Sequence, residues 1–111
     1  MSETLEAIAE EIVDRAESLG DVERSTDGVT ATFSRSSEAF AVADPAGFEF
    51  RVGTTIAAAA LRTPDVSESS RGGDWVRFEP TELERTAVDR AVAWFEAAWR
   101  RGRIPTSRAR T

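Results

Sequence analysis

The sequence predicts an α+β fold, with helices packed on an antiparallel sheet of four to five strands. Apolar residues recur with the 3.6-residue period of a helix in residues 2–19 and 81–101. Between residues 21 and 53 the period changes to two, which is typical of strands, and a further strand is predicted at residues 74–79. The predicted order is α-β-β-β(-β)-α-β-α. Because the first strands follow one another through short turns, we expect an antiparallel sheet.

The first predicted helix spans residues 2–19. Ser2 is a suitable N-cap, and Gly20 is a suitable residue to end the helix. The opposite face from the apolar stripe is acidic and is expected to lie in solvent. The stripe that we expect to be buried consists of Leu5, Ile8, Ala9, Ile12, Val13, Ala16 and Leu19.

Three alternating runs come next, separated by the turn-forming segments 35–37 and 44–47. A short strand at residues 22–24 is expected to precede them, because Asp27-Gly28 is a hairpin signal. Together they predict a meander with one buried face. The apolar positions of the three runs are Val29, Ala31 and Phe33, then Phe40 and Val42, then Phe48, Phe50 and Val52.

A second, short helix is predicted from Gly53 to Arg62, with Thr54 as its N-cap. Pro64 should end it, because the residue before a proline avoids the helical region. Residues 64–73 are then predicted to form a polar loop, the most mobile segment of the chain.

The segment 72–101 organises the rest of the chain, because it joins a turn, a strand and the last helix and contains all three tryptophans. Side chains of a strand point alternately to the two faces of its sheet. The strand therefore has an inner pair, Val76 and Phe78, and an outer set of Trp75, Arg77 and Glu79.

Thr81 and Glu84 match a capping box, so the last helix is predicted to run from Thr81 to Arg101 and to stop at Gly102. Its apolar stripe is broad, which suggests contact with more than the sheet. Residues 1–102 are predicted to form a single domain. Residues 103–111 lack periodicity and are predicted to be a basic, disordered tail.

The order of elements, together with the Trp75-Val76-Arg77-Phe78 strand before the closing helix, resembles the small YjbR/MmcQ-like α+β domains. The resemblance covers nearly the whole chain. It implies the double-wing fold of that family and, by analogy of shape, DNA binding. It implies no catalytic residue.

The composition excludes several kinds of chemistry. The 111 residues include no His, Cys, Lys, Tyr, Asn or Gln, and all 14 basic residues are arginine, against 20 acidic residues, for a net charge of −6. Catalytic triads, cysteine nucleophiles, structural Cys/His zinc sites and catalytic lysines are therefore absent. Any catalysis would use carboxylates, hydroxyls or arginines, and no cofactor is expected.

The same composition bears on location. No apolar run approaches the roughly 20 residues of a membrane span, and the acidic N-terminus does not look like a signal peptide. We therefore expect a cytoplasmic protein that does not bind membranes. An acidic excess suits a cytoplasm at molar salt, so a halophilic archaeon is the hypothesis for its source. An ordinary acidic protein from a GC-rich genome is the alternative.

Two tryptophans and several arginines form the candidate contact surface. An indole on an exposed sheet face marks an interaction site, although a loop or helix edge over Trp75 would also explain it. Five of the 14 arginines follow residue 99, so an Arg-rich tail is available for phosphates or for an acidic protein surface. The candidate residues are Trp75, Arg77, Trp94, Arg100, Arg101 and Arg103.

Weaker candidates concern anions and carboxylates. A helix N-terminus after a glycine can hold an anion, which here would involve Arg51, Gly53, Thr54 and Thr55. The loop at residues 69–73 is a second anion candidate. Asp65, Glu68, Glu79 and Glu82 could bind a metal ion or act as acid and base, but their spacing matches no regular metal motif.

The sequence thus predicts a small non-catalytic interaction module, which binds a protein partner or a second copy of itself. The alternative is a nucleic-acid-binding protein that uses the Arg-rich tail and the sheet face. A carboxylate-dependent enzyme is the third hypothesis.

Overall fold

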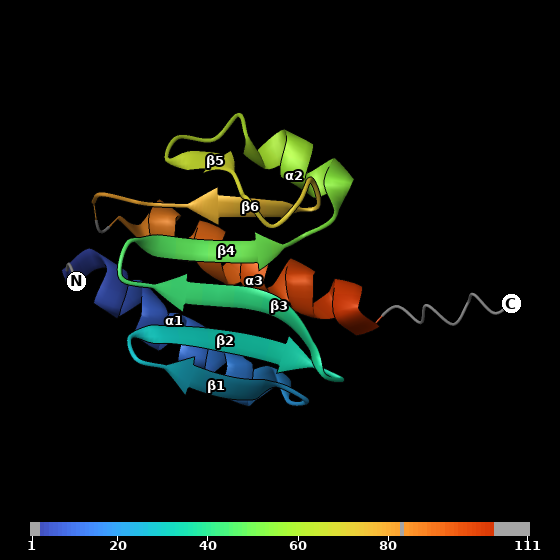
Figure 1. Cartoon of the computed structure of the whole chain (residues 1–111). Coiled ribbons are helices and arrows are strands. Elements are labelled where there is room, and N and C mark those ends of the chain that lie inside the picture. Colours follow the sequence, from blue (N-terminus) through green and yellow to red (C-terminus); the bar gives the residue numbers. More distant parts are fainter. Residues whose placement is uncertain (1–2, 83, 104–111) are drawn as a thin grey trace, which may run out of the picture.

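A computed structural model describes residues 3–82 and 84–103 of the chain. Its six strands form one antiparallel sheet in the order β1-β2-β3-β4-β6-β5, which confirms the α+β class (Figure 1). The elements are α1 (Glu3–Leu19), β1 (Glu23–Asp27), β2 (Thr30–Arg35), β3 (Glu38–Asp44), β4 (Gly47–Arg51), α2 (Thr54–Ala60), β5 (Val66–Glu68), β6 (Trp75–Phe78) and α3 (Arg85–Arg103).

Strands β1 to β4 form the predicted meander, joined by tight turns. Asp27 pairs with Thr30, so Gly28 and Val29 are the two turn residues, and Gly28 has a φ of 65°. Val29 was predicted to point inward with the next strand, which is wrong: it occupies the turn and is 69% exposed. Ser36 and Ser37 both have positive φ, as the turn type that matches the sheet twist requires.

A β-bulge changes the face of one predicted core residue. The register between β2 and β3 shifts after Phe33, so β3 contains one extra residue. Phe40 therefore turns toward the helices, while Val42 pairs with Glu49 on the other face of the sheet. The prediction that Phe40 and Val42 share a face is wrong for this reason.

Helices α1 and α3 lie side by side and cover one face of the sheet (Figure 1). The core lies between this layer and the sheet. Phe95 of α3 is at its centre, with its ring 5.3 Å from that of Phe33 and 5.2 Å from that of Phe40. Four residues of the predicted α1 stripe are buried, namely Leu5, Ile8, Ile12 and Ala16.

The other face, toward the viewer in Figure 1, carries no helix over β1 to β4 in the described part of the chain. We call it the open face. Helix α2 lies beside β6 at one end of the sheet. Among residues 3–82 and 84–103, no helix is both long and apolar enough to span a bilayer.

The sixth strand, β5, was not predicted, because it lies in the supposed polar loop 64–73. Val66 pairs with Phe78, Ser67 with Arg77 and Glu68 with Val76. A strand of three mostly polar residues has little propensity of its own, so its form depends on the edge that β6 provides.

Two helix starts also differ from the prediction. Gly53, with a φ of 93°, is the N-cap of α2 and none of the described side chains caps this helix, so Thr54 is its first residue instead. The Glu84 carbonyl accepts the hydrogen bond of the Val88 N–H at 3.2 Å, so α3 begins at Arg85 and not at Thr81.

Helix α3 begins later than predicted because the chain must first cross from β6 to the helix layer that packs on β2 to β4. Helix α2 ends at Ala60, short of the predicted Arg62. Helix α3 continues through Gly102 to Arg103, so the predicted stop is also wrong. The predicted cap Ser2 and residues 104–111 of the predicted tail lie outside the described residues.

Candidate functional site

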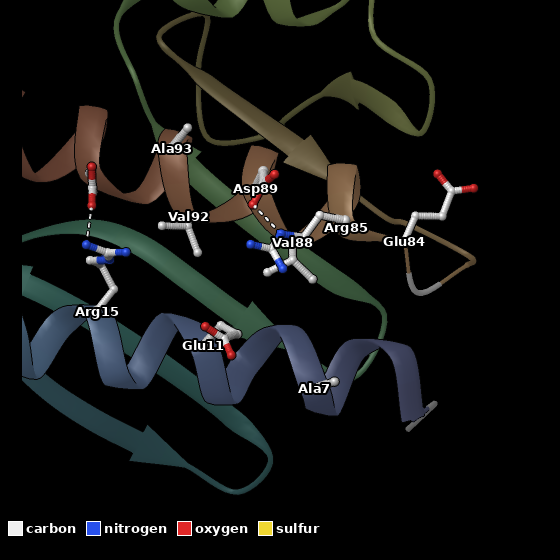
Figure 2. A pocket seen from close by; sticks show the side chains of 10 residues that line it. Ala7, Glu11, Arg15, Glu84, Arg85, Val88, Asp89, Val92 and Ala93 are labelled. Atoms are coloured by element: carbon white, nitrogen blue, oxygen red, sulfur yellow. Dashed lines mark ion pairs between the residues drawn. The ribbon is translucent and has the colours of Figure 1, made fainter.

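A groove runs between α1 and α3 on the side away from the sheet (Figure 2). It encloses about 960 Å³, the largest volume among the described pockets. We call it the α1–α3 groove. Its apolar residues are Ala7, Val88, Val92 and Ala93, and its charged residues are Glu11, Arg15, Glu84, Arg85, Asp89 and Glu96.

The groove explains why the apolar stripe of α3 is so broad. Phe95 and Ala91 face the sheet and are fully buried. Val88 and Val92 lie to one side of them, face α1, and are only half-buried. Because Ala7 and Ala93 are small, the two helices leave space between their outer edges.

The charges of the groove are only partly compensated. Arg15 spans it and pairs with Glu96 at 3.0 Å. Arg85 pairs with Asp89 at 3.5 Å, but both side chains are well exposed, so the pair contributes little. Of the other two carboxylates, neither Glu11 nor Glu84 has an arginine within ion-pair distance in the described part of the chain. The rim is therefore acidic.

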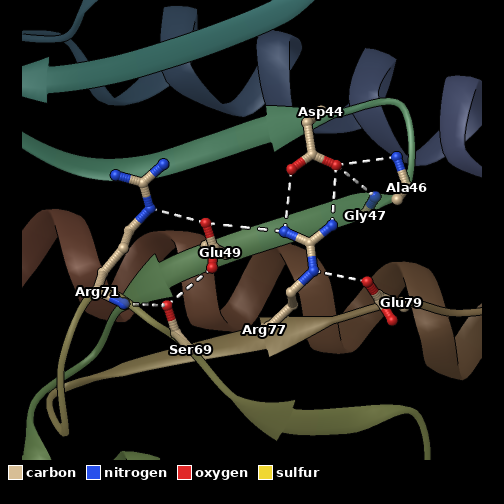
Figure 3. Close-up of polar contacts among 8 residues, drawn as sticks. All are labelled: Asp44, Ala46, Gly47, Glu49, Ser69, Arg71, Arg77 and Glu79. Atoms are coloured by element: carbon tan, nitrogen blue, oxygen red, sulfur yellow. Dashed lines mark hydrogen bonds and ion pairs between the residues drawn. The ribbon is translucent and has the colours of Figure 1, made fainter.

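The open face carries a second cluster of charged residues, centred on Glu49 (Figure 3). The Glu49 side chain is 7% exposed. Its Oε2 accepts a hydrogen bond from Ser69 Oγ at 2.8 Å, and its Oε1 accepts one from Arg71 Nε at 2.7 Å. Arg77 Nη1 lies 3.7 Å from the same Oε1. The loop after β5 is thereby tied to β4.

Arg77 holds the other half of this cluster. Its two terminal nitrogens donate to the two oxygens of Asp44, each at 2.9 Å, and its Nε donates to Glu79 at 2.6 Å. These carboxylates raise the pKa of Arg77 above its ordinary value. Each of the three side-chain nitrogens of Arg77, a candidate contact residue, thus donates a hydrogen bond within the protein.

The same contact shifts the titration of Asp44. The hydrogen bond from Arg77 lowers the pKa of this carboxyl below its ordinary value of 3.8, and the Ala46 and Gly47 N–H groups add to the effect, against the opposing influence of burial. Asp74 behaves alike, because the hydrogen bond from Arg51 lowers its pKa.

These two shifts predict how stability depends on pH. A carboxyl whose pKa is lower in the folded state stabilises the protein above its ordinary pKa, and this contribution is lost as the pH falls through the folded pKa. We therefore expect the free energy of unfolding to decrease as the pH is lowered below 3.8. Asp44→Asn should lose about 1–2 kcal/mol at pH 7 and show a weaker decline in acid. Urea unfolding of both proteins at pH 7 and at pH 3 measures this, and equal declines would contradict it.

The candidate tryptophans are both half-buried. Trp94 lies over the sheet, with its ring 5.1 Å from that of Phe78 and 6.4 Å from that of Phe50. Trp75 is on the opposite face, as predicted, with the Arg71 guanidinium 5.3 Å from its ring. It lines a pocket of about 420 Å³ between α2 and the loop at residues 68–73.

The structure brings the anion candidates together with two of the arginines. Gly53, Thr54, Thr55, Arg100 and Arg101 line one pocket of about 450 Å³. The charge of the arginines in this region is largely neutralised within the protein. The carboxylate and backbone of Asp74 accept from Arg51 Nε at 2.8 Å and from the Gly53 N–H at 2.9 Å, and Arg101 lies 3.7 Å from the carboxylate.

The remaining candidates are dispersed. Arg100 is 3.9 Å from Glu96, and Arg103 ends α3, with its side chain outside the described residues. Ser69, from the second anion candidate, is buried against Glu49. Within residues 3–82 and 84–103, no three acidic side chains converge as metal ligands would.

The sequence did not point to Glu11, Arg15 or Ala93, which belong to helices far apart in the chain. The available signal was the breadth of the α3 stripe. No protein-family model, no curated protein and no solved structure matches this chain. Its function is therefore inferred from the geometry of its surface.

Proposed function

We propose that the protein is a small, non-catalytic protein-interaction module that binds its partner in the α1–α3 groove. The partner presents an amphipathic helix, with an apolar face for the groove floor and arginines or lysines beside it. The observation that carries this proposal is the combination of an apolar floor with an acidic rim in which Glu11 and Glu84 have no arginine partner among the described residues.

A helix that lies in a groove is held by apolar anchors at helical spacing. Val88 and Val92 are one turn apart on α3 and offer half-buried apolar surface to such anchors. The uncompensated carboxylates would select a basic partner and reject an acidic one, because like charges across an interface oppose binding. We also propose that the protein works in the cytoplasm of a salt-adapted cell. The apolar contacts in the groove would persist there, although molar salt screens the charges.

The surface predicted from the sequence is less suited to this role. Binding through Arg77 would compete with its paired hydrogen bonds to Asp44. The ring of Trp94 packs against Phe78 inside the protein, so it offers less surface to a partner. The pocket beside Trp75 remains available as a second, smaller contact area.

Nucleic-acid binding, the alternative, has less support from the described residues. Arginines that bind phosphate must be free to do so. On the open face and beside α2, Arg51, Arg71 and Arg77 each have a carboxylate within 2.9 Å. This alternative therefore depends on the Arg-rich tail.

Ala93→Arg tests the groove directly. Ala93 is exposed and helical, so the change should leave the fold intact while it fills the groove and repels a basic partner. Ala59→Arg on α2 is the matched control, because Ala59 is also exposed and helical but lines none of the described pockets. Tagged full-length proteins would be used to capture partners from extract of the source cells in molar KCl.

We expect one protein to be recovered with the wild type and with Ala59→Arg, but at least about tenfold less with Ala93→Arg, which corresponds to about 1.4 kcal/mol. Equal recovery with both variants, or no protein recovered with the wild type, would contradict the proposal. Nucleic acid that is recovered only when residues 104–111 are present would favour the alternative.

A further inference from the structure

We propose that residues 104–111 of the chain dock in its own α1–α3 groove and compete there with the partner. This inference rests on the proposed function, because it names a regulator of the same groove. The occupant is a named segment that carries Arg108 and Arg110, and the contact is within one chain. Three observations support it: the face of α3 on which the segment begins, the length of the segment, and the charges of the groove within its reach.

The chain leaves α3 on the side of the groove. Position 103, the last of the helix, follows Glu96 by seven residues. Seven residues are close to two turns of an α-helix, so both positions lie on the same face. Glu96 lines the groove. The backbone therefore enters residues 104–111 about 10 Å beyond Glu96, at a rise of about 1.5 Å per residue.

The length of the segment limits what it can contact. An extended chain spans about 3.4 Å per residue, so Arg108 reaches at most about 17 Å from position 103 and Arg110 about 24 Å. Val92 lies about 16 Å back along α3 and Glu84 about 28 Å. The Cα atoms of both arginines therefore reach the Val92 end of the groove, but neither Cα atom reaches Glu84.

Glu11 is a groove carboxylate within that reach that has no arginine partner among the described residues. Arg15 pairs with Glu96 across the groove, so Glu11, one turn earlier on α1, lies opposite Val92 (Figure 2). It has no arginine within ion-pair distance in the described part of the chain. Arg108 or Arg110 would compensate this charge, while Ala109 would offer its methyl group to Val92 and Ala93. Exposed pairs of this kind are weak, so a partner can displace the segment.

The absence of cysteine permits a direct test in the full chain. A spin label on Thr111→Cys broadens the NMR signals of nearby amides. We expect broadening at Glu11 and Arg15 to exceed that at Glu84 and at Ser25, on the distant strand β1, by roughly threefold, as a weak exposed contact allows. In a mixed control sample, one protein carries the spin label but no isotope, and the other carries the isotope but no spin label. This sample should show no broadening, because the contact is within one chain.

Charge variants provide the matched controls. Glu11→Gln, and separately Arg108→Gln with Arg110→Gln, should reduce the broadening near Glu11 to the level at Ser25. Glu84→Gln should change it much less, because Glu84 lies beyond the Cα reach of both arginines. Uniform broadening, an equal effect of Glu84→Gln, or broadening in the mixed sample would overturn the proposal.

The two proposals fail separately. If the label shows no contact while Ala93→Arg still abolishes partner capture, only the docking of the segment is wrong. If the label shows the contact but no partner depends on Ala93, the interaction function is wrong.

Discussion

Replacing Phe95 by alanine should lower the free energy of unfolding by about 3–5 kcal/mol, the usual loss for a large buried aromatic residue. Phe95 is fully buried and its ring contacts those of Phe33 and Phe40. The substitution removes these contacts and leaves a cavity where α3 meets β2 and β3. Because domains of this size are stable by only about 5–15 kcal/mol, much of the total would be lost.

Urea unfolding followed by tryptophan fluorescence measures this change. Phe95→Leu should cost less, because it fills most of the cavity, and Thr86→Ala, on the exposed side of α3, should cost less than about 0.5 kcal/mol. A loss below about 1 kcal/mol for Phe95→Ala would show that the core closes around the site or that Phe95 is not at its centre.

Replacing Glu49 by alanine should cost about 2–3 kcal/mol, because it removes one member of a buried charged cluster. Ser69 Oγ and Arg71 Nε would both lose their acceptor. Arg71 is partly exposed and can turn to water, and Arg77 keeps Asp44, which together limit the loss. The loop after β5 should also loosen, and faster amide hydrogen exchange at residues 69–72 would report this.

Two comparisons separate the contributions to this loss. Glu49→Gln keeps an acceptor for Ser69 without the charge, so it should cost about half as much. Glu38→Ala removes an exposed carboxylate that lies 3.9 Å from Arg51, and it should cost less than about 1 kcal/mol. If Glu49→Ala were as mild as Glu38→Ala, the cluster would not hold the loop.

Much of the fold follows from local patterns in the sequence. The alternation around Phe33, Phe48 and Phe50 identified the meander, and the 3.6-residue pattern identified α1 and α3. The positions of Val76 and Phe78 assigned Trp75 to the opposite face correctly, as the burial of the two inner residues shows. In each case the periodicity arises because one face of the element is buried. The pattern among residues close together in the sequence is enough to reveal that face.

The errors arose where distant parts of the chain decide the structure. The three residues of β5 form a strand only because β6 offers an edge, and the bulge that separates Phe40 from Val42 depends on pairing with β2. The capping pattern at Thr81 describes a possible helix start, but the path from β6 to the helix layer moves the start to Arg85.

The candidate site was the least predictable part. The α1–α3 groove combines residues 7–15 with residues 84–96, and no sequence pattern states that these helices are neighbours. The arginines were visible in the sequence, but their partners were not. Arg77 appeared to be available for binding until the structure placed it against Asp44, which lies 33 residues earlier in the chain.

The position of α3 in the chain has a consequence for synthesis. Strands β2 to β4, which α3 covers, are complete at Arg51, but α3 ends at Arg103. At about 5–20 residues per second, a ribosome needs roughly 3–10 s to add the intervening residues. During this interval Phe33, Phe40 and Phe50 have no α3 to cover them. The nascent chain therefore exposes apolar strand surface during synthesis, the kind of surface that makes incomplete chains prone to aggregate.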